Sequence, residues 1–427
     1  MCLFLSSLFS HGHLPIDLLD TVIVPLLKDK KGDICDKDNY RPIALTCIMS
    51  KIFELVLLSK LEDYFTTSPS QFGFKKGLST DTCVFSVKQT IEYYMSLSSP
   101  VYLCFLDASK AFDKINHWTL FKKLLLRGVP AIVVRLLYKW YQLQLFYVKW
   151  GNVISNHFNV CNGVRQGGIL SPTLFNVYMD DLSVKLCQTN IGCFLNNVSL
   201  NHILYADDTV VIAPSPNSIQ CIINACSQYA VENDITFNAK KTKLMCVKPN
   251  VLKDLLVPDI FLDGQIIELV SSHKYLGVII SNDLKDDLDI KRQIRGVYAR
   301  GNAIVKCFRQ CTPEVKTVLF KTYCTSFYCS QLWCCFSNNV ITKLKGAYNR
   351  IFRYLFNIVK RVTSISAAMM SYSINTFYAV TRNYASGFIQ RLSICDNELV
   401  TVLIRSTQFY SSRLFQQWCH HVYVLHV

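Results

Sequence analysis

The sequence predicts a mixed fold of helices and strands, of the α/β (α+β) class, followed by a helical and basic C-terminal part. The 427 residues are 51% apolar, which suits two or three packed subdomains and excludes a disordered chain. Short β-branched runs alternate with helical patterns as far as about residue 280. From NDLKDDLDIKRQI at 282–294 onward the pattern is helical, so this segment marks the expected subdomain boundary.

The N-terminal part of the chain predicts one strand and two helices. TVIVPLL at 21–27 has the composition of a short strand, and a helical pattern lies within 43–65. After the glycine-marked QFGFKKGLST at 71–80, a second helical pattern runs to about residue 97. The apolar start MCLFLSSLFSHGHLP has neither a basic region nor a small-residue cleavage site, so we interpret it as a helix end rather than a signal peptide.

Two predicted strands carry acids at their ends. VYLCFLD at 101–107 is a continuous apolar run that ends in Asp107, which is typical of a buried central strand. The runs HILY and TVVIA flank Asp207 and Asp208, and this pattern predicts a tight hairpin with both acids at its turn. An Asp-Asp turn can be purely structural, because Asp side chains cap turns.

A third acid, Asp107, favours a catalytic role for the Asp207–Asp208 turn over a purely structural one. If the two predicted strands are neighbours, Asp107, Asp207 and Asp208 converge, and their repulsion would keep protons on them unless a divalent cation lies among them. Hard oxygen ligands favour Mg²⁺, with Mn²⁺ as the alternative. A two-metal carboxylate site suits phosphoryl transfer, in which one ion activates a 3′-hydroxyl and the other neutralises the triphosphate and the leaving pyrophosphate.

A second acid pair, YMDD at 178–181, has the context of a helix. Ser171 is a candidate N-cap, and Pro172 is a candidate first helical residue. Apolar residues recur every four positions on one face, at Leu174, Tyr178, Leu182 and Leu186. This periodicity places Asp180 and Asp181 on the polar side, so we expect them to be ordinary surface acids of an amphipathic helix.

The excess positive charge is confined to the last third of the chain. Residues 290–427 hold 18 Lys and Arg against 3 Asp and Glu, which equals the formal net charge of +15. A solvated basic face is one interpretation, but such a bias is expected of a polyanion-binding module, and we favour nucleic acid over a membrane surface. The uncharged stretches 322–342 and 362–381 are rich in polar residues and predict no membrane span.

The 19 cysteines are scattered through apolar stretches, and no two are spaced as C-x-x-C. Reduced, buried thiols fit this pattern better than a disulfide framework does. We therefore expect an intracellular protein, in the nucleus, the cytoplasm or both.

Seven segments of the sequence form a recognisable series. In chain order they are NYRPIALTCIMSKIFE, QFGFKKGLST, FLDASKAFDKINH, NGVRQGGILSPTLFNVY, YADDTVVIA, FNAKKTKLM and HKYLGVIIS. Together they resemble segments of the reverse transcriptases of non-LTR (LINE-type) retrotransposons. The resemblance covers about residues 15–282 and continues more loosely to about 360. It implies a right-hand polymerase fold with an antiparallel palm sheet and mostly helical fingers and thumb. It also implies DNA synthesis from dNTPs on an RNA template with a DNA primer.

The resemblance implies a division into subdomains. In chain order they are fingers at 1–99, a palm with embedded fingers elements at 100–269, a primer-grip hairpin at 270–282, a helical basic thumb at 283–360 and a basic C-terminal tail at 361–427. Complete elements of this family usually also encode an endonuclease, and none is visible in the 427 residues, so we expect a truncated copy. The alternative to an RNA-directed DNA polymerase is a catalytically inactive, nucleic-acid-binding remnant.

By the same resemblance, Asp107, Asp207 and Asp208 are the metal ligands and the pair at 180–181 is not. Phe112, five residues after Asp107, resembles the aromatic gate below the incoming sugar. A flat ring there leaves no room for a 2′-hydroxyl, which gives a preference for deoxynucleotides. The alternative is that Phe112 only packs a helix start into the core.

Four further residues match segments that bind the substrate. Lys28 and Arg41 resemble the fingers cations that hold the triphosphate, a task suited to an ammonium and a guanidinium group, although cations near turns are often only solvated. Gln166 and Gly167 lie in the glycine-rich NGVRQGG before a helix start. Glycines there let the backbone approach a nucleotide or template strand closely, and a plain glycine turn is the alternative.

The last two matching segments concern the leaving group and the primer. Lys241 in FNAKKTK matches a lysine proposed to protonate the leaving pyrophosphate, and Lys240 and Lys243 lie close enough to leave the assignment open. HKYLGVIIS resembles the hairpin that grips the primer 3′ end, or it is a plain core strand. The expected tip of that hairpin consists of Tyr275, Leu276 and Gly277.

Overall fold

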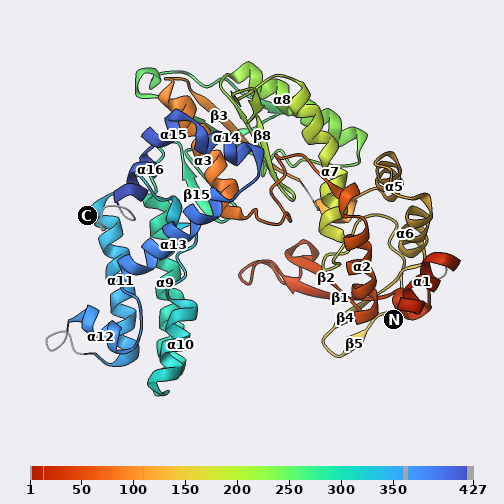
Figure 1. The fold of residues 1–427 in the computed structure, drawn as a ribbon, viewed down its shortest axis with the longest axis horizontal. Helices are drawn as coiled ribbons and strands as arrows, with labels where there is room; N and C mark the ends of the chain where they lie inside the picture. Colours follow the sequence, from red (N-terminus) through yellow and green to blue (C-terminus); the bar gives the residue numbers. More distant parts are fainter. Residues whose placement is uncertain (1, 13, 109, 359–363, 421–427) are drawn as a thin grey trace.

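The computed structural model describes residues 2–12, 14–108, 110–358 and 364–420 (Figure 1). Strands and helices are mixed as far as Ser281, and every described element after it is helical. The predicted mixed fold and the change to helices near residue 282 are therefore confirmed. Figure 1 shows a sheet and its covering helices at the top, the N-terminal elements at the right and the C-terminal helices at the left.

A five-stranded central sheet occupies the middle of the molecule, with the strand order β13-β10-β3-β9-β8. Neighbouring strands are antiparallel except β10 and β13, which are parallel. Its strands are β3 (Val101–Asp107), β8 (His202–Tyr205), β9 (Asp208–Ala213), β10 (Lys243–Val247) and β13 (Glu268–Leu269).

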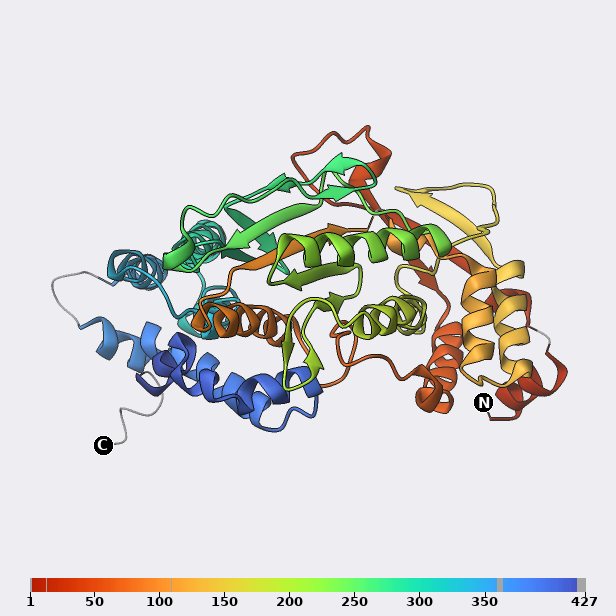
Figure 2. The ribbon, with the colours of Figure 1, turned by 90° about the horizontal axis from the view of Figure 1, so that it is seen from above.

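Both faces of the central sheet are buried, which explains why its strands are continuously apolar. The covering helices are α3 (Thr80–Ser96), α7 (Ser171–Gln188) and α8 (Pro216–Glu232). In β3, Leu103 and Phe105 pack into one core with α3, whereas Cys104 and Leu106 pack into another with α7 and α8. The long green helix in Figure 2 is α8, which runs along the sheet.

A four-stranded N-terminal sheet, with the order β2-β1-β4-β5, lies beside the central sheet. Its strands are β1 (Asp20–Leu27), β2 (Tyr40–Thr46), β4 (Leu145–Trp150) and β5 (Val153–Ile154). The helices of this part are α1 (Cys2–His11), α2 (Ile48–Lys60), α4 (Ala111–Lys114), α5 (His117–Leu126) and α6 (Ala131–Leu143). Because β1 pairs with β4, this sheet includes strands from the middle of the chain.

The C-terminal part begins with a hairpin and continues as helices. The hairpin consists of β14 (Ser272–Tyr275) and β15 (Val278–Ser281). The helices α9 (Asp287–Phe308), α10 (Pro313–Tyr323), α11 (Asn338–Phe356) and α12 (Ile365–Ser371) share a third core. The predicted boundary at residue 360 falls within 359–363, outside the described residues.

The last helices return to the central sheet. They are α13 (Phe377–Ser393), α14 (Glu398–Arg405), α15 (Thr407–Ser411) and α16 (Arg413–Trp418). The ring of Phe85 on α3 lies 5.7 Å from that of Phe388 and 6.2 Å from that of Trp418, between centroids. Within the described part of the predicted tail, α12 and the start of α13 therefore pack with the third core, and the residues from Ala385 onward pack into the core on the α3 face.

Several short elements complete the described structure. Two small hairpins are formed by β6 (Phe194–Leu195) with β7 (Val198–Ser199) and β11 (Phe261–Leu262) with β12 (Gln265–Ile266). Short 3₁₀ helices lie at Ile16–Leu18, Lys37–Asn39, Glu62–Phe65, Asn250–Leu252 and Ser330–Leu332. Among the described helices, none combines the length and the hydrophobicity needed to cross a bilayer.

Candidate functional site

Three aspartates lie where β3 ends and β9 begins. Asp107 and Asp208 are direct partners in the antiparallel register of these strands. β8 and β9 are joined by Ala206 and Asp207, and Tyr205 pairs with Asp208. Ala206 has a left-handed backbone, with φ 57°, which costs about 1 to 2 kcal/mol for an L-residue. The predicted hairpin and its predicted neighbour strand are confirmed, and we term Ala206, Asp207 and Asp208 the acidic turn.

The carboxylates of the acidic turn reach solvent, but the surrounding protein excludes much of the bulk water. This desolvation raises the pKa of Asp208 to about 6, and the charges of Asp207 and Asp107 add to the shift. Desolvation also raises the pKa of Asp207, with a further contribution from Asp107 and an opposing one from Arg41. The carboxylates therefore repel one another, and a cation among them would relieve that repulsion.

A cleft of about 1700 Å³ lies between the N-terminal sheet and the central sheet. Most predicted site residues line it, namely Lys28, Arg41, Asp107, Phe112, Gln166, Gly167, Asp207 and Lys241. Asp208 is not among its described lining residues. Burial raises the pKa of Cys83 to about 12 and the charge of Asp208 adds to the shift, so Asp208 lies near that thiol on the α3 face.

The donor set of this site suits a hard cation. Asp107, Asp207 and Asp208 offer only carboxylate oxygens, which Mg²⁺ prefers. Within the described residues, no group of three or more His, Cys, Asp or Glu side chains is arranged closely enough to coordinate a metal ion. The ligand types of the three aspartates therefore fit Mg²⁺.

The glycine-rich segment 163–168 forms one wall of the cleft. The backbone N–H of Ala44 donates to the carbonyl of Gln166 (2.7 Å), and the side-chain Nε2 of Gln166 donates to Asp113 Oδ1 (2.9 Å). Gly167 has φ 123°, and a Cβ there would lie 2.7 Å from the carbonyl oxygen of Ala44. Only glycine fits this close approach, so Gly167 has a steric function in the wall itself.

A buried ion pair holds this segment, and the sequence pattern assigned it no role. Arg165 pairs with Glu54 on α2, and both side chains are almost fully buried. Glu54 Oε2 also accepts a hydrogen bond from the backbone N–H of Ile169 (2.6 Å). The guanidinium carbon of Arg165 lies 4.6 Å from the ring centroid of Trp140. The pair thus fixes the segment that leads into α7.

The lysines of FNAKKTK have different partners. Lys241 Nζ lies 4.0 Å from Asp107 Oδ2, and its side chain is 68% exposed. Lys243 instead pairs with Glu268 at 2.5 Å, and its ammonium group also donates to the carbonyl of Lys240. Of Lys241 and Lys243, only the first therefore lies beside the aspartates.

The two N-terminal cations line the opposite side of the cleft. Lys28 follows β1, and its Nζ donates to the carbonyl of Asp38 (2.8 Å). Arg41 is exposed on β2, directly opposite Leu26 of β1. The charge of Arg41 opposes the rise in the pKa of Asp207, so its guanidinium group is within electrostatic range of the acidic turn.

Phe112 contacts two other aromatic rings near the start of α4. Its ring stacks on that of Phe175 from α7, with centroids 4.4 Å apart and planes 2° apart. The ring of Phe74 approaches at 6.4 Å, nearly edge-on. Phe112 is half-buried and lines the cleft. It therefore packs the start of α4 and presents part of its ring to the cleft.

The β14–β15 hairpin differs from expectation in one residue. Leu276 and Gly277 form its turn, with φ 45° and 81°, and the carbonyl of Leu276 accepts a hydrogen bond from the hydroxyl of Tyr328 (2.9 Å). Tyr275 is 3% exposed and lies within the core, with its hydroxyl 3.3 Å from Cys83 Sγ. The ring of Tyr275 thus packs the hairpin against the central sheet instead of standing at the tip.

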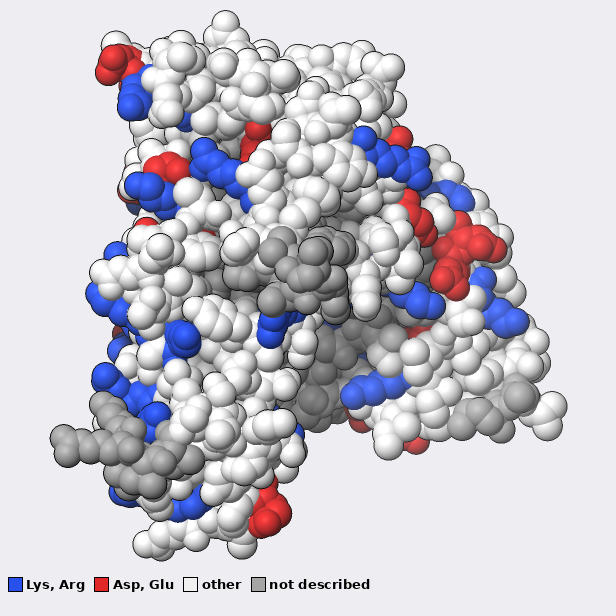
Figure 3. Space-filling view, turned by 60° about the vertical axis from the view of Figure 1, so that its left-hand side comes forward, with Lys and Arg blue, Asp and Glu red and all other residues white. Residues whose placement is uncertain are grey.

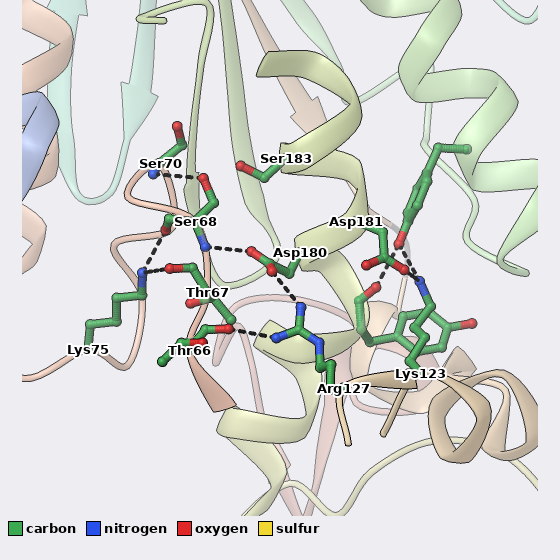
Figure 4. A network of polar contacts seen from close by, with 12 residues as sticks. Thr66, Thr67, Ser68, Ser70, Lys75, Lys123, Arg127, Asp180, Asp181 and Ser183 are labelled. Carbon is green, nitrogen blue, oxygen red and sulfur yellow. Dashed lines mark hydrogen bonds and ion pairs between the residues drawn. The ribbon is translucent and has the colours of Figure 1, made fainter. Parts of the chain in front are cut away.

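The second acid pair is structural, although not in the way that the sequence predicts (Figure 4). Asp180 is 6% exposed. It accepts hydrogen bonds from the backbone N–H of Ser68 (2.6 Å) and from Arg127 (2.5 Å). Asp181 pairs with Lys123 of α5. The expectation of surface acids is wrong for Asp180, because α7 is also covered on this side, by the segment before α3.

Comparison with known proteins identifies the family. The family described as reverse transcriptase (RNA-dependent DNA polymerase) matches residues 28–280, more than half of the chain. The chain belongs to the reverse transcriptase family. The probable RNA-directed DNA polymerase from transposon X-element of Drosophila melanogaster is 25% identical over 386 residues, which cover 86% of this chain and 41% of that protein. The predicted relationship to non-LTR retrotransposon reverse transcriptases is confirmed.

Two further comparisons extend over nearly the whole reverse transcriptase chain. The RNA-directed DNA polymerase from mobile element jockey of D. melanogaster is 23% identical over 424 residues, or 94% of this chain and 44% of that protein. The chain thus spans less than half the length of these curated relatives. A structure of telomerase from Candida tropicalis, in complex with a TWJ fragment of telomeric RNA, has a TM-score of 0.48 and 13% identity, covering 96% of this chain and 65% of that one.

Proposed function

We propose that this reverse transcriptase family member is an RNA-directed DNA polymerase that adds deoxynucleotides to the 3′-hydroxyl of a DNA primer on an RNA template. The observation that carries the proposal is the cleft beside the acidic turn. The cleft, of about 1700 Å³, is lined by Asp107 and Asp207 and by the cations Lys28, Arg41 and Lys241. Asp208 lies directly opposite Asp107.

The three aspartates are the proposed ligands for Mg²⁺, with Mn²⁺ as the alternative. When bound, the ions activate the 3′-hydroxyl and neutralise charge on the triphosphate and pyrophosphate. Asp208, whose pKa is raised to about 6, is still mostly ionised at neutral pH. Asp107 and Asp207 face the cleft, which gives the nucleotide access to their oxygens.

The cations of the cleft have separate proposed roles. Arg41 and Lys28 hold the triphosphate from the N-terminal sheet, because both line the cleft across from the aspartates. Lys241 is the proposed donor of a proton to the leaving pyrophosphate. Its exposed ammonium group lies 4.0 Å from the carboxylate of Asp107, so it can reach a phosphate oxygen held at the same place.

The remaining wall residues recognise the nucleotide by shape. Phe112 is the proposed support for the incoming sugar. Stacking on Phe175 fixes the position of its ring, so a 2′-hydroxyl on the sugar would clash with it. Gly167 leaves the backbone open to a nucleotide, and Gln166 is held in place through Asp113. Leu276 and Gly277, at the hairpin turn, are the proposed contacts with the primer end, with Tyr275 packed behind them.

The proposed right-hand subdomains follow from this arrangement. The N-terminal sheet and its helices are the fingers, the central sheet is the palm and the α9–α12 helices are the thumb, while α13–α16 join the palm by packing on α3. The last third of the sequence carries the net charge of +15. Figure 3 shows Lys and Arg side chains spread over the face that this part presents. Such a surface suits salt-sensitive contacts with the template and primer backbones.

Primer extension tests the proposal. The purified protein is given an RNA template, an annealed DNA primer and dNTPs, with Mg²⁺ or with EDTA. The expected result is templated extension only in Mg²⁺, and a Phe112→Val variant is expected to accept ribonucleotides more readily than the parent. A folded protein that binds the duplex in a salt-sensitive manner but incorporates no nucleotide would contradict the proposal.

A further inference from the structure

The acidic turn rests against a second segment of the chain. Residues 66–75, which we term the cradle segment, run beside β8 at the edge of the central sheet. The backbone N–H of Leu204 donates to the carbonyl of Ser70 (2.9 Å), and that of Phe72 donates to the carbonyl of Leu204 (2.8 Å). These two bonds extend the sheet by one short parallel pairing. They bring the side chain of Gln71 to the place where β8 ends.

Gln71 holds the turn through its buried carboxamide. The residue is 1% exposed. Its Oε1 accepts a hydrogen bond from the backbone N–H of Ala206 (3.3 Å) and another from Gly73 (2.9 Å). Ala206 is the residue with the left-handed backbone, so its amide N–H points out of the strand ladder toward this oxygen. An unpaired buried amide would cost about 1 to 3 kcal/mol, and the Oε1 of Gln71 gives the amide of Ala206 its partner, while the Nε2 of Gln71 is buried without one.

Gly73 allows the cradle segment to approach this closely. A Cβ at Gly73 would lie 2.4 Å from the backbone nitrogen of Ala206 and 3.0 Å from the carbonyl carbon of Tyr205. Behind Gly73, the side chain of Asn176 on α7 donates to its carbonyl (2.7 Å). The backbone of the cradle segment at Gly73 therefore packs directly against the acidic turn, and α7 holds that backbone from behind through Asn176.

The base of the cradle segment is fixed by the network in Figure 4. Asp180 accepts from the backbone of Ser68, while Arg127 joins Asp180 to the carbonyl of Thr66 (2.6 Å). The ammonium group of Lys75 donates to the carbonyls of Thr67 (2.9 Å) and Ser68 (2.6 Å). α7 thus holds the segment at its base through Asp180 and at its tip through Asn176.

From this geometry we infer that Gln71 is a positioning residue of the reaction, and that it sets the direction of Asp207 by fixing the amide of Ala206. The inference rests on the proposed polymerase function for its catalytic consequence. Asp207 follows Ala206 directly, so the backbone angles of Ala206 decide where that carboxylate points in the cleft. Gln71 itself is not among the described residues that line the cleft. Its effect passes through the turn.

The test compares two variants of the full chain. Gln71→Met keeps the length of the side chain and removes the acceptor. Gln89→Met is the matched control, because Gln89 is also buried, at 4% exposed, but lies on α3 and contacts Glu92. Two readouts are measured, namely amide hydrogen exchange over residues 200–208 and the Mg²⁺ concentration that gives half-maximal primer extension.

In Gln71→Met we expect at least tenfold faster exchange at Ala206 and a several-fold higher Mg²⁺ requirement, with the KM for dNTP unchanged. Gln89→Met should keep the exchange of the parent in this segment. Unchanged exchange in Gln71→Met overturns the inference whether or not the protein extends primers. Faster exchange with an unchanged Mg²⁺ requirement overturns the catalytic role. If the parent extends no primer, the proposed function fails, and the exchange result alone decides whether Gln71 holds the turn.

Discussion

Asp107 and Asp208 face each other across two antiparallel strands, as direct partners in register. Like charges in this position repel, and cross-strand pairs of this kind destabilise a sheet. Desolvation raises the pKa of Asp208 to about 6, and the charges of Asp207 and then Asp107 add to the shift. The like charges at the site therefore lower the stability of the folded protein. Their effect can be measured as a change in stability, without any substrate.

Removing the charge of Asp208 should stabilise the metal-free protein. A carboxyl whose pKa is raised in the folded state binds protons more tightly when folded, so it favours folding at low pH and this contribution is lost as the pH rises through about 6. We expect Asp208→Asn to melt at a higher temperature than the parent at pH 8 in EDTA. The difference should shrink as the pH is lowered toward 4. A variant that melts lower than the parent at pH 8 would show that the repulsion is absent.

Replacing Asp180 should weaken the fold and not merely the surface. The carboxylate is buried and bonded to both Arg127 and the backbone of Ser68. Its loss leaves the guanidinium group of Arg127 bonded to the carbonyl of Thr66 but without its carboxylate partner, and breaking such buried pairs costs about 3 kcal/mol or more. We expect Asp180→Ala to lower the free energy of unfolding by this amount in urea denaturation. Asp254→Ala, at an exposed position, should change it by less than about 0.5 kcal/mol.

Two glycines should respond to alanine in opposite directions. At Gly73 the added Cβ would lie 2.4 Å from the backbone nitrogen of Ala206, so we expect a loss of about 1 to 3 kcal/mol and reduced primer extension. At Gly346, within α11, a Cβ meets nothing within 4 Å. Alanine there should stabilise the helix by about 1 kcal/mol. Denaturation curves of the two variants decide this, and a neutral Gly73→Ala would refute the close approach.

The two adjacent lysines should differ in their effect on the reaction. Lys241 lies 4.0 Å from the carboxylate of Asp107, and a general acid contributes about 100-fold or more to a rate. We expect Lys241→Ala to slow single-nucleotide incorporation by about 100-fold with little change in melting temperature. Lys240→Ala should retain nearly the parental rate. Equal losses in both variants would indicate a shared electrostatic role and not proton donation by Lys241.

The parts of the site that could be predicted depend on local patterns. The apolar run ending in Asp107, the hairpin around Asp207 and the glycines near Gln166 each follow from a few neighbouring residues. The pairing of the two strands needed the assumption that they are neighbours, which their register now supports. The fold class and the change to helices near residue 282 could also be predicted, because the hydrophobic periodicity that indicates them is a property of neighbouring residues.

The features that could not be predicted from the sequence depend on contacts between residues that are far apart in the chain. The buried pairing of Asp180 with Arg127 spans 53 positions, and that of Arg165 with Glu54 spans 111. No local pattern distinguishes such acids from surface ones, so Asp180 was assigned to the wrong environment. The contacts of the C-terminal helices are equally long-range, since Arg391 on α13 pairs with Asp81 on α3, 310 positions away.

The central claim is that the acidic turn is the reaction centre of an RNA-directed DNA polymerase. The most direct measurement compares primer extension in Mg²⁺ by the parent, Asp207→Asn and Asp254→Asn, each shown to be folded by its melting curve. The account predicts extension by the parent and Asp254→Asn, and a loss of at least 1000-fold in Asp207→Asn. Extension by Asp207→Asn at the rate of the parent would contradict it.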